Sequence, residues 1–249
     1  MEAVKPIPVT SPGRAPIRFW LRCQLDLQLK TITAFLRPTL APLRGALLDV
    51  GAGQSPWRDL LPPGVTYQGV DVALAGDFGM DPQPDVILYE GEVLPVADAA
   101  FDVALCVEVL EHSPRPGTLI REIHRALKPG GLLVLTVPWS ARRHHVPHDY
   151  HRFTREGLDL LLREAGFVDV AIAERGDNVA VLANKLLVLA VEMLRPVASP
   201  AVLWRVPLGV WCAAQLPAFL AAAHLTMALG RGPVEDPLGY AVTARRQPA

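Results

Sequence analysis

A histidine-rich segment at residues 142–154, RRHHVPHDYHRFT, carries the side chains best suited to chemistry. It contains four histidines, one aspartate, one tyrosine and three arginines. An imidazole titrates near neutral pH, so it can remove a proton from a substrate hydroxyl or bind a transition metal. Segments of this kind also occur as solvated polar loops. A metal site, a catalytic loop and a polar surface turn are therefore the alternatives.

The spacing of these histidines argues against a metal site. His144 and His148 are four residues apart and His148 and His151 are three apart, so a helix would place each pair on one face. Pro147 opposes such a helix, because proline removes a backbone donor and clashes with the preceding turn. No cysteine or carboxylate set with metal-ligand spacing accompanies them. We therefore expect no metal ligand here.

Two glycines follow a short apolar run in ALLDVGAG, at residues 46–53. Glycine adopts positive φ values and lets a ligand approach the backbone, so Gly51 and Gly53 predict either a ligand loop or a strand-ending turn. Asp71 comes twenty residues after Gly51, in the apolar run VTYQGVDV. A carboxylate there suits a ribose, because it accepts hydrogen bonds from both hydroxyls. Residues 54–56, Gln-Ser-Pro, lack the third glycine of a dinucleotide fingerprint.

Apolar runs alternate with helical patterns around these residues. Strands are expected at residues 46–53, 65–72, 101–110, 132–139, 168–174 and 239–246, helices at 17–36, 116–127 and 154–167, and a turn at 128–131. Pro38 is expected to end the first helix. This order indicates an α/β fold with a mostly parallel sheet that helices cover on both faces. The carboxyl ends of the strands should bring the glycine loop, Asp71 and the histidine-rich segment to one crevice.

The overall composition argues against several kinds of partner and location. The chain has 249 residues with 24 basic and 25 acidic side chains, so it lacks the broad basic field of a nucleic-acid-binding protein. Cys23, Cys106 and Cys212 are dispersed, as is typical of free thiols in a reducing compartment. The first fifteen residues are proline-rich and precede no apolar signal segment, which predicts a flexible tail and a cytoplasmic protein.

The segment between the last two expected strands is predominantly apolar. Helices are expected at residues 178–194 and 206–230, and residues 210–229 have no formal charge. A final strand in the same sheet requires the chain to return, which disfavours a single membrane span. The alternatives are an interfacial hairpin, an apolar lid, a dimer surface or buried core. We favour either an apolar lid or an interfacial hairpin, which would place residues 179–229 in peripheral contact with the inner face of the membrane. The expected division is a tail and helix at 1–44, a catalytic domain at 45–177 and 236–249, and an insertion at 178–235.

The order of these motifs resembles the class I S-adenosylmethionine-dependent methyltransferases of the small-molecule type. The similarity covers residues 46–174, from LLDVGAG and GVDV through FDVALCVEVLEH and HRALKPGGLLVLTVP to REGLDLLLREAGF. It implies a Rossmann-like seven-stranded sheet and S-adenosyl-L-methionine as the cofactor. The contacts it implies are Asp49, Gly51 and Gly53 at the methionine part, Asp71 at the ribose, Val72 at the adenine, Glu90 or Glu92 with Gly91 at the adenine amine, and Cys106 at the next strand end. Departures from the family are Val96, where phenylalanine is usual, and Ser55-Pro56, where many members carry glycine.

A subgroup of this family has a segment similar to HVPHDYHRFT, at residues 145–154, and a helical insertion before the final strand. Methyl transfer requires an aligned acceptor that is often deprotonated. The roles we expect are His145 or His148 as general base, Asp149 orienting it, and Tyr150 and Arg152 positioning the substrate. The predicted acceptor is small or lipid-linked, with a hydroxyl as the favoured group.

Two other functions remain as alternatives. A nicotinamide-dependent oxidoreductase could use a similar sheet, but the third glycine and a Tyr-x-x-x-Lys pair are missing. A membrane-associated module could keep the cofactor pocket and have no chemistry. Glu108 and Glu111 could form a catalytic pair, but a loop that leads into a helix, with His112 in a structural hydrogen bond, is the simpler interpretation.

Overall fold

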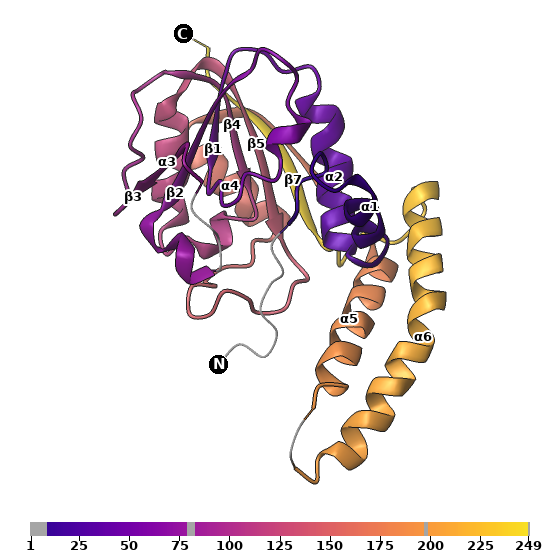
Figure 1. Ribbon diagram of the computed structural model, residues 1–249. Helices are drawn as coiled ribbons and strands as arrows, with labels where there is room; N and C mark the ends of the chain where they lie inside the picture. The colour runs from indigo at the N-terminus through magenta and orange to yellow at the C-terminus, as the bar shows by residue number, and fades with distance from the viewer. Residues whose placement is uncertain (1–8, 79–82, 197–198, 249) are drawn as a thin grey trace.

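A seven-stranded sheet forms the centre of the protein (Figure 1). The computed structural model describes residues 9–78, 83–196 and 199–248, so the first eight residues of the expected tail lie outside it. The strands are β1 (Ala46–Val50), β2 (Thr66–Val72), β3 (Val86–Tyr89), β4 (Phe101–Val107), β5 (Leu127–Pro138), β6 (Phe167–Arg175) and β7 (Gly239–Arg246). Their order is β3-β2-β1-β4-β5-β7-β6, and β7 is antiparallel to both of its neighbours. The predicted Rossmann-like, mostly parallel sheet is confirmed.

Helices cover both faces of this sheet. α1 (Pro16–Leu25) and α2 (Leu27–Leu40) pack on one face, and α3 (Pro116–Ala126) and α4 (Arg155–Glu164) pack on the other (Figure 1). Successive side chains of a strand point to opposite faces, so Leu47 packs with α1 and α2 whereas Leu48 packs with α3 and α4. Both leucines are fully buried, which explains why β1 is a continuous apolar run in the sequence.

The single helix predicted at residues 17–36 is wrong. Asp26 has non-helical φ and ψ values of −89° and 88°, and its carboxylate accepts a hydrogen bond from the Leu29 N–H at 3.1 Å. This N-cap separates α1 from α2. Pro38 does not end α2, which continues to Leu40. Leu40 is fully buried against the sheet, so packing holds the last turn despite the backbone donor that proline lacks.

Two details of the sheet also differ from the prediction. β3 has no counterpart among the expected strands, because it is a four-residue edge strand with one buried residue, Val86. The expected turn at residues 128–131 lies within β5, where the partners of β4 pass from Leu127 directly to Leu132. The intervening residues form a bulge, and Gly130 supports it with a φ of +77°.

An apolar helical hairpin is inserted between β6 and β7. α5 (Asn178–Met193) and α6 (Val202–Leu229) lie side by side and project from the body of the protein (Figure 1). The base of the hairpin packs on α2 through Leu27, Ala180 and Ala223. α6 is long and apolar enough to cross a membrane by length and composition. The chain nevertheless returns to the sheet as β7, as the sequence predicted.

Candidate functional site

A cavity opens at the carboxyl ends of β1, β2, β3 and β4. Its wall combines the glycine loop after β1, the end of β2, the turn after β3 and the segment after β4. The lining residues are Gly51, Gly53, Asp71, Val72, Tyr89, Gly91, Glu92, Glu108, Val109, His112, Ser113, Pro114, Arg115, Thr118, Leu119 and His145. The predicted meeting of the glycine loop, Asp71 and the histidine-rich segment at one crevice is confirmed.

Gly51 brings the backbone of the glycine loop close to the opposite wall. Its φ of +70° lies in the left-handed region, and a Cβ at this position would come 2.4 Å from Cγ2 of Val109. The N–H groups of Gly51 and Ala52 donate to the Val70 carbonyl at 2.9 and 3.1 Å. The loop is therefore both a strand-ending turn and a part of the cavity wall, the two alternatives that the sequence left open.

Asp71 ties the end of β2 to the glycine loop. Its Oδ2 accepts a hydrogen bond from the Gly53 N–H at 2.7 Å, and its Oδ1 accepts one from the Val72 N–H at 2.7 Å. Burial raises the pKa of this carboxyl, and the two N–H groups oppose that rise. A carboxylate has about four lone-pair sites. Asp71 therefore retains capacity to accept hydrogen bonds from a ligand in the cavity.

Asp49 lies beneath the glycine loop rather than in the cavity wall. It is almost completely buried, and Oη of Tyr67 donates to its Oδ2 at 2.8 Å. The same Oη is hydrogen-bonded to Oγ of Ser55 at 2.8 Å, so Ser55 helps to anchor the loop where many family members carry glycine. Burial raises the pKa of Asp49 to about 7, although the Tyr67 hydrogen bond acts against this.

Asp49→Asn is expected to stabilise the protein increasingly as the pH rises. In the unfolded chain this carboxyl ionises near its ordinary pKa of 3.8, whereas the folded protein keeps the proton up to about pH 7. The folded state therefore binds more protons, so the wild-type free energy of unfolding falls across this window. Asparagine removes that loss, which is up to about 4 kcal/mol above pH 7. Urea denaturation at several pH values between about 4 and 8 measures it, and a pH-independent difference between the proteins would contradict it.

The remaining predicted cofactor residues divide into two groups. Val72, Gly91 and Glu92 line the cavity. Cys106 does not line it, because it is fully buried in the core of the sheet, where burial raises the pKa of its thiol. Glu90 is exposed and also lies outside the wall. Of the two glutamates considered for the adenine amine, Glu92 is therefore the one that lies at the cavity.

The segment after β4 supplies lining residues that the sequence did not predict. Glu108 has a φ of +54°, and its Oε1 accepts a hydrogen bond from Arg175 at 2.7 Å. The usable signal was its position directly after a central parallel strand.

Nδ1 of His112 donates to the His148 carbonyl at 2.7 Å, which confirms the structural hydrogen bond expected of His112. Glu111 is fully buried, and burial raises its pKa well above the ordinary value.

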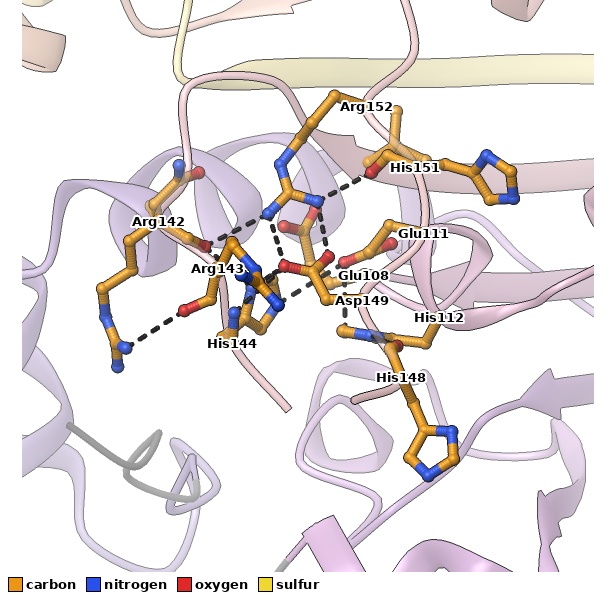
Figure 2. Close-up of polar contacts among 12 residues, drawn as sticks. Glu108, Glu111, His112, Arg142, Arg143, His144, His148, Asp149, His151 and Arg152 are labelled. Atoms are coloured by element: carbon orange, nitrogen blue, oxygen red, sulfur yellow. Dashed lines mark hydrogen bonds and ion pairs between the residues drawn. The ribbon is translucent and has the colours of Figure 1, made fainter. Parts of the chain in front are cut away.

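An ion pair braces the histidine-rich loop (Figure 2). The Arg152 guanidinium donates to both carboxylate oxygens of Asp149, at 2.6 and 2.9 Å. It also donates to the carbonyls of Arg142 and His151, and Asp149 accepts a hydrogen bond from the His144 N–H at 3.0 Å. Partial burial raises the pKa of Asp149, but Arg152 and this N–H outweigh it and hold the pKa below its ordinary value.

Of the five predicted catalytic residues, His145 lies in the cavity wall. His148 lies beside Tyr150, with 3.1 Å between Nδ1 and Oη, and Tyr150 is largely exposed. Asp149 and Arg152 contact each other and the loop backbone. These contacts favour a role for Asp149 and Arg152 in positioning the loop. The sequence could not indicate this pairing, because it depends on how an irregular segment folds.

The sequence relatives of this chain are described as methyltransferases. The family described as a methyltransferase domain matches residues 21–172, more than half of the chain. A relative from Mycobacterium bovis, described as an uncharacterized methyltransferase, is 32% identical over 139 residues, which cover 49% of this chain and 51% of that protein. The ubiquinone biosynthesis O-methyltransferase of Paracidovorax citrulli is 36% identical over 103 residues, which cover 37% of this chain and 43% of that enzyme. The chain thus spans about half the length of the curated relatives it matches.

A solved structure shares the fold. The phosphoethanolamine N-methyltransferase 2 of Haemonchus contortus aligns with a TM-score of 0.50 and 17% identity, over 88% of this chain and 52% of that chain. The residues that match the family run from α1 into β6 and include the glycine loop, Asp71 and the histidine-rich loop. On this match and on the architecture of the sheet, the chain belongs to the methyltransferase-domain family.

Proposed function

We propose that the protein transfers a methyl group from S-adenosyl-L-methionine to a hydroxyl of a small or lipid-linked acceptor. The main support is the cavity itself, where the glycine loop, the Asp71 carboxylate and the His145 imidazole face one space. Family membership supports the reaction, and the O-methyltransferase among the relatives supports an oxygen acceptor. The H. contortus enzyme contains S-adenosylhomocysteine, which is the product of such a transfer.

The cavity wall fits the parts of this cofactor. Gly51 has no side chain, so the backbone is accessible to the methionine part. Asp71 has lone pairs left for the two ribose hydroxyls after it has accepted its two backbone N–H groups. Val72 and Glu92 lie further along the wall, where the adenine would bind. Residues 45–177 and 236–249 would form the catalytic domain, with residues 178–235 as its insertion.

The cofactor carries the methyl group on a sulfonium sulfur. When the methyl group is transferred, a neutral thioether is the leaving group. The protein must align the acceptor and take up its hydroxyl proton. His145 lies in the cavity wall, which favours its imidazole as the acceptor of that proton, whereas His148, the second candidate, does not line the cavity. The Asp149–Arg152 ion pair holds the loop that carries both histidines.

Calorimetric titration of the purified chain tests the cofactor. We expect S-adenosylmethionine to bind with a micromolar dissociation constant and NAD to give no binding heat. Binding of NAD alone would favour the oxidoreductase. If S-adenosylmethionine binds but no methyl group reaches any component of a lipid extract or of a small-metabolite extract, the protein is a cofactor-binding module and the enzymatic proposal is wrong.

His145→Ala and His148→Ala are expected to identify the base. Loss of a general base lowers kcat by about 10²–10⁴-fold, and cofactor binding should survive. Arg143→Ala is the matched control, because Arg143 is exposed in the same loop and should not affect turnover. Transfer of a labelled methyl group to the acceptor measures kcat. Full turnover in both histidine variants would exclude a base from this loop.

We infer that the hairpin of α5 and α6 contacts a lipid surface, as a peripheral attachment of a cytoplasmic protein to the inner face of the membrane. Leu203, Trp204 and Trp211 are 78%, 57% and 58% exposed. Tryptophan and the nearby Arg205 suit the headgroup region, and exposed apolar side chains gain free energy on leaving water. An apolar lid over the acceptor and a dimer surface are the alternatives.

Trp211→Glu is expected to weaken binding to vesicles of phosphatidylglycerol and phosphatidylethanolamine by about tenfold or more, because burying a large apolar side chain contributes about 1.5–3 kcal/mol. Leu160→Glu is the matched control, since Leu160 is also 58% exposed but lies on α4. Vesicle flotation measures the bound fraction. Equal binding of the two variants would contradict lipid contact, and a dimer that Trp211→Glu dissociates without vesicles would favour a dimer surface.

A further inference from the structure

Three histidines from two segments meet at the rim of the cavity. His112 follows β4, while His144 and His145 belong to the histidine-rich loop, and one ring nitrogen of each lies within 4.8 Å of the other two. Their ring centroids are 4.7, 5.1 and 5.3 Å apart. This set differs from the metal alternative weighed from the sequence, which grouped His144 with His148 and His151.

Backbone carbonyls orient two of these rings. Nδ1 of His112 lies 2.7 Å from the His148 carbonyl oxygen, and Nδ1 of His144 lies 3.1 Å from the Arg142 carbonyl oxygen. A carbonyl oxygen only accepts hydrogen bonds, so Nδ1 carries the proton in each ring and Nε2 keeps a lone pair. Metal-ligating histidines have this arrangement, because their second nitrogen donates to a carbonyl or a carboxylate.

A buried carboxyl group faces the same two nitrogens. Glu111 is 0% exposed, and neither of its carboxyl oxygens has a hydrogen-bond partner among the described residues. Its Oε1 lies 3.6 Å from Nε2 of His112 and 3.9 Å from Nε2 of His144. These separations are too long for hydrogen bonds. A buried carboxylate without a partner is costly, and a cation held between it and the rings would offset that cost.

We propose that His112, His144 and His145, with Glu111 as the fourth ligand, form a site for a divalent transition metal such as Zn²⁺. Imidazole and carboxylate ligands suit this class of ion, and four of them complete a tetrahedral shell. Nitrogens bound to one zinc ion lie about 3.4 Å apart, so the rings would draw together by about 1 Å. His144 and His145 lie in a segment without helix or strand, which permits this movement.

The location of the metal site gives it a role that rests on the proposed methyl transfer. His112 and His145 line the cavity, so the ion lies beside the space that an acceptor would enter. A hydroxyl oxygen bound to this ion in place of Glu111 would lose its proton more readily, because the cation would stabilise the oxyanion. His145 would then be a metal ligand, and the proton would pass to solvent, because His148 does not line the cavity. The acceptor class is a hydroxyl compound that binds the metal as an oxyanion.

Titration of the chelator-treated full chain with zinc chloride tests the site without any acceptor. We expect one zinc ion per chain. His144→Ala should weaken zinc binding by more than about 100-fold. Loss of a residue that only hydrogen-bonds to a metal ligand weakens binding by about 10–100-fold, so a larger loss identifies His144 as a ligand. His145→Asn is the second ligand variant, because asparagine tolerates the positive φ of 52° at this position. His148→Ala is the matched control, since alanine keeps the carbonyl that orients His112.

Two further readouts separate this proposal from the methyltransferase proposal. Co²⁺ should give the visible absorption bands of a tetrahedral nitrogen and oxygen shell. His144 lies outside the cavity wall, so His144→Ala should bind S-adenosylmethionine as the wild type does. The metal site is overturned if the wild type binds no zinc, if His144→Ala and His145→Asn both keep wild-type affinity, or if a sulfur-to-cobalt charge-transfer band assigns the ion to a cysteine.

Discussion

Asp71→Ala is expected to lower the affinity for S-adenosylmethionine by about 10²–10⁴-fold. The Asp71 carboxylate would accept both ribose hydroxyls, and each hydrogen bond to a charged group contributes about 1.5–3 kcal/mol. The variant also releases the N–H groups of Gly53 and Val72, so the glycine loop loses its tie to β2. Both losses act on the cofactor site. Calorimetric titration of the variant and the wild type measures the change.

Two controls separate the ribose contact from the loop. Asp71→Asn keeps an oxygen for one backbone N–H but loses the charge, so its affinity should fall between those of the wild type and Asp71→Ala. Asp159→Ala removes an acid from α4, where Asp159 pairs with Arg163 on the surface, and should bind the cofactor as the wild type does. If Asp71→Ala binds S-adenosylmethionine within about threefold of the wild-type affinity, Asp71 does not contact the cofactor.

Arg175→Met is expected to lower the free energy of unfolding by about 3–5 kcal/mol, because it removes the hydrogen bonds of a buried guanidinium and leaves the partly buried Glu108 carboxylate unpaired. Arg175 ends β6 and is 3% exposed. Its guanidinium contacts Oε1 of Glu108 at 2.7 Å and the carbonyls of Val137 and Tyr240 at 3.2 Å. It also reaches Thr31 of α2 at 3.2 Å. One side chain thus joins β5, β6, β7, α2 and the segment that lines the cavity after β4.

The cost of Arg175→Met should depend on Glu108. In the double variant Arg175→Met/Glu108→Gln the remaining partner is neutral, so the loss should be smaller than the sum of the single losses. Arg163→Met breaks an exposed pair with Asp159 and should have little effect. Urea denaturation at neutral pH measures the wild type, the two single variants, the double variant and Arg163→Met. A loss in Arg175→Met no larger than that in Arg163→Met would show that the buried network does not hold the sheet to α2.

The sequence by itself determined six of the seven strands and the location of the cavity. Strands buried on both faces are continuous apolar runs, so β1, β4 and β5 could be found from hydrophobicity alone. Gly51, Gly53 and Asp71 follow or end such runs. The carboxyl ends of parallel strands share one edge of a sheet, so these residues had to meet regardless of the connecting segments.

Packing decided the elements that the sequence predicted wrongly. β3 is short and lies at an edge, so its single buried residue leaves little hydrophobic signal. Pro38 disfavours a helix locally, but the burial of Leu40 carries α2 past it. The Asp26 cap separates two helices whose apolar positions form one continuous pattern in the sequence.

Only the tertiary structure decided how the histidine-rich loop is built. It pairs Asp149 with Arg152, directs His145 to the cavity, and brings His112 from the segment after β4 to His144. A sequence pattern reports regular elements, because their periodicity is local. The loop has no periodicity, and its contacts join residues from separate segments. The path of the folded chain therefore determines which of its imidazoles and carboxylates can act together.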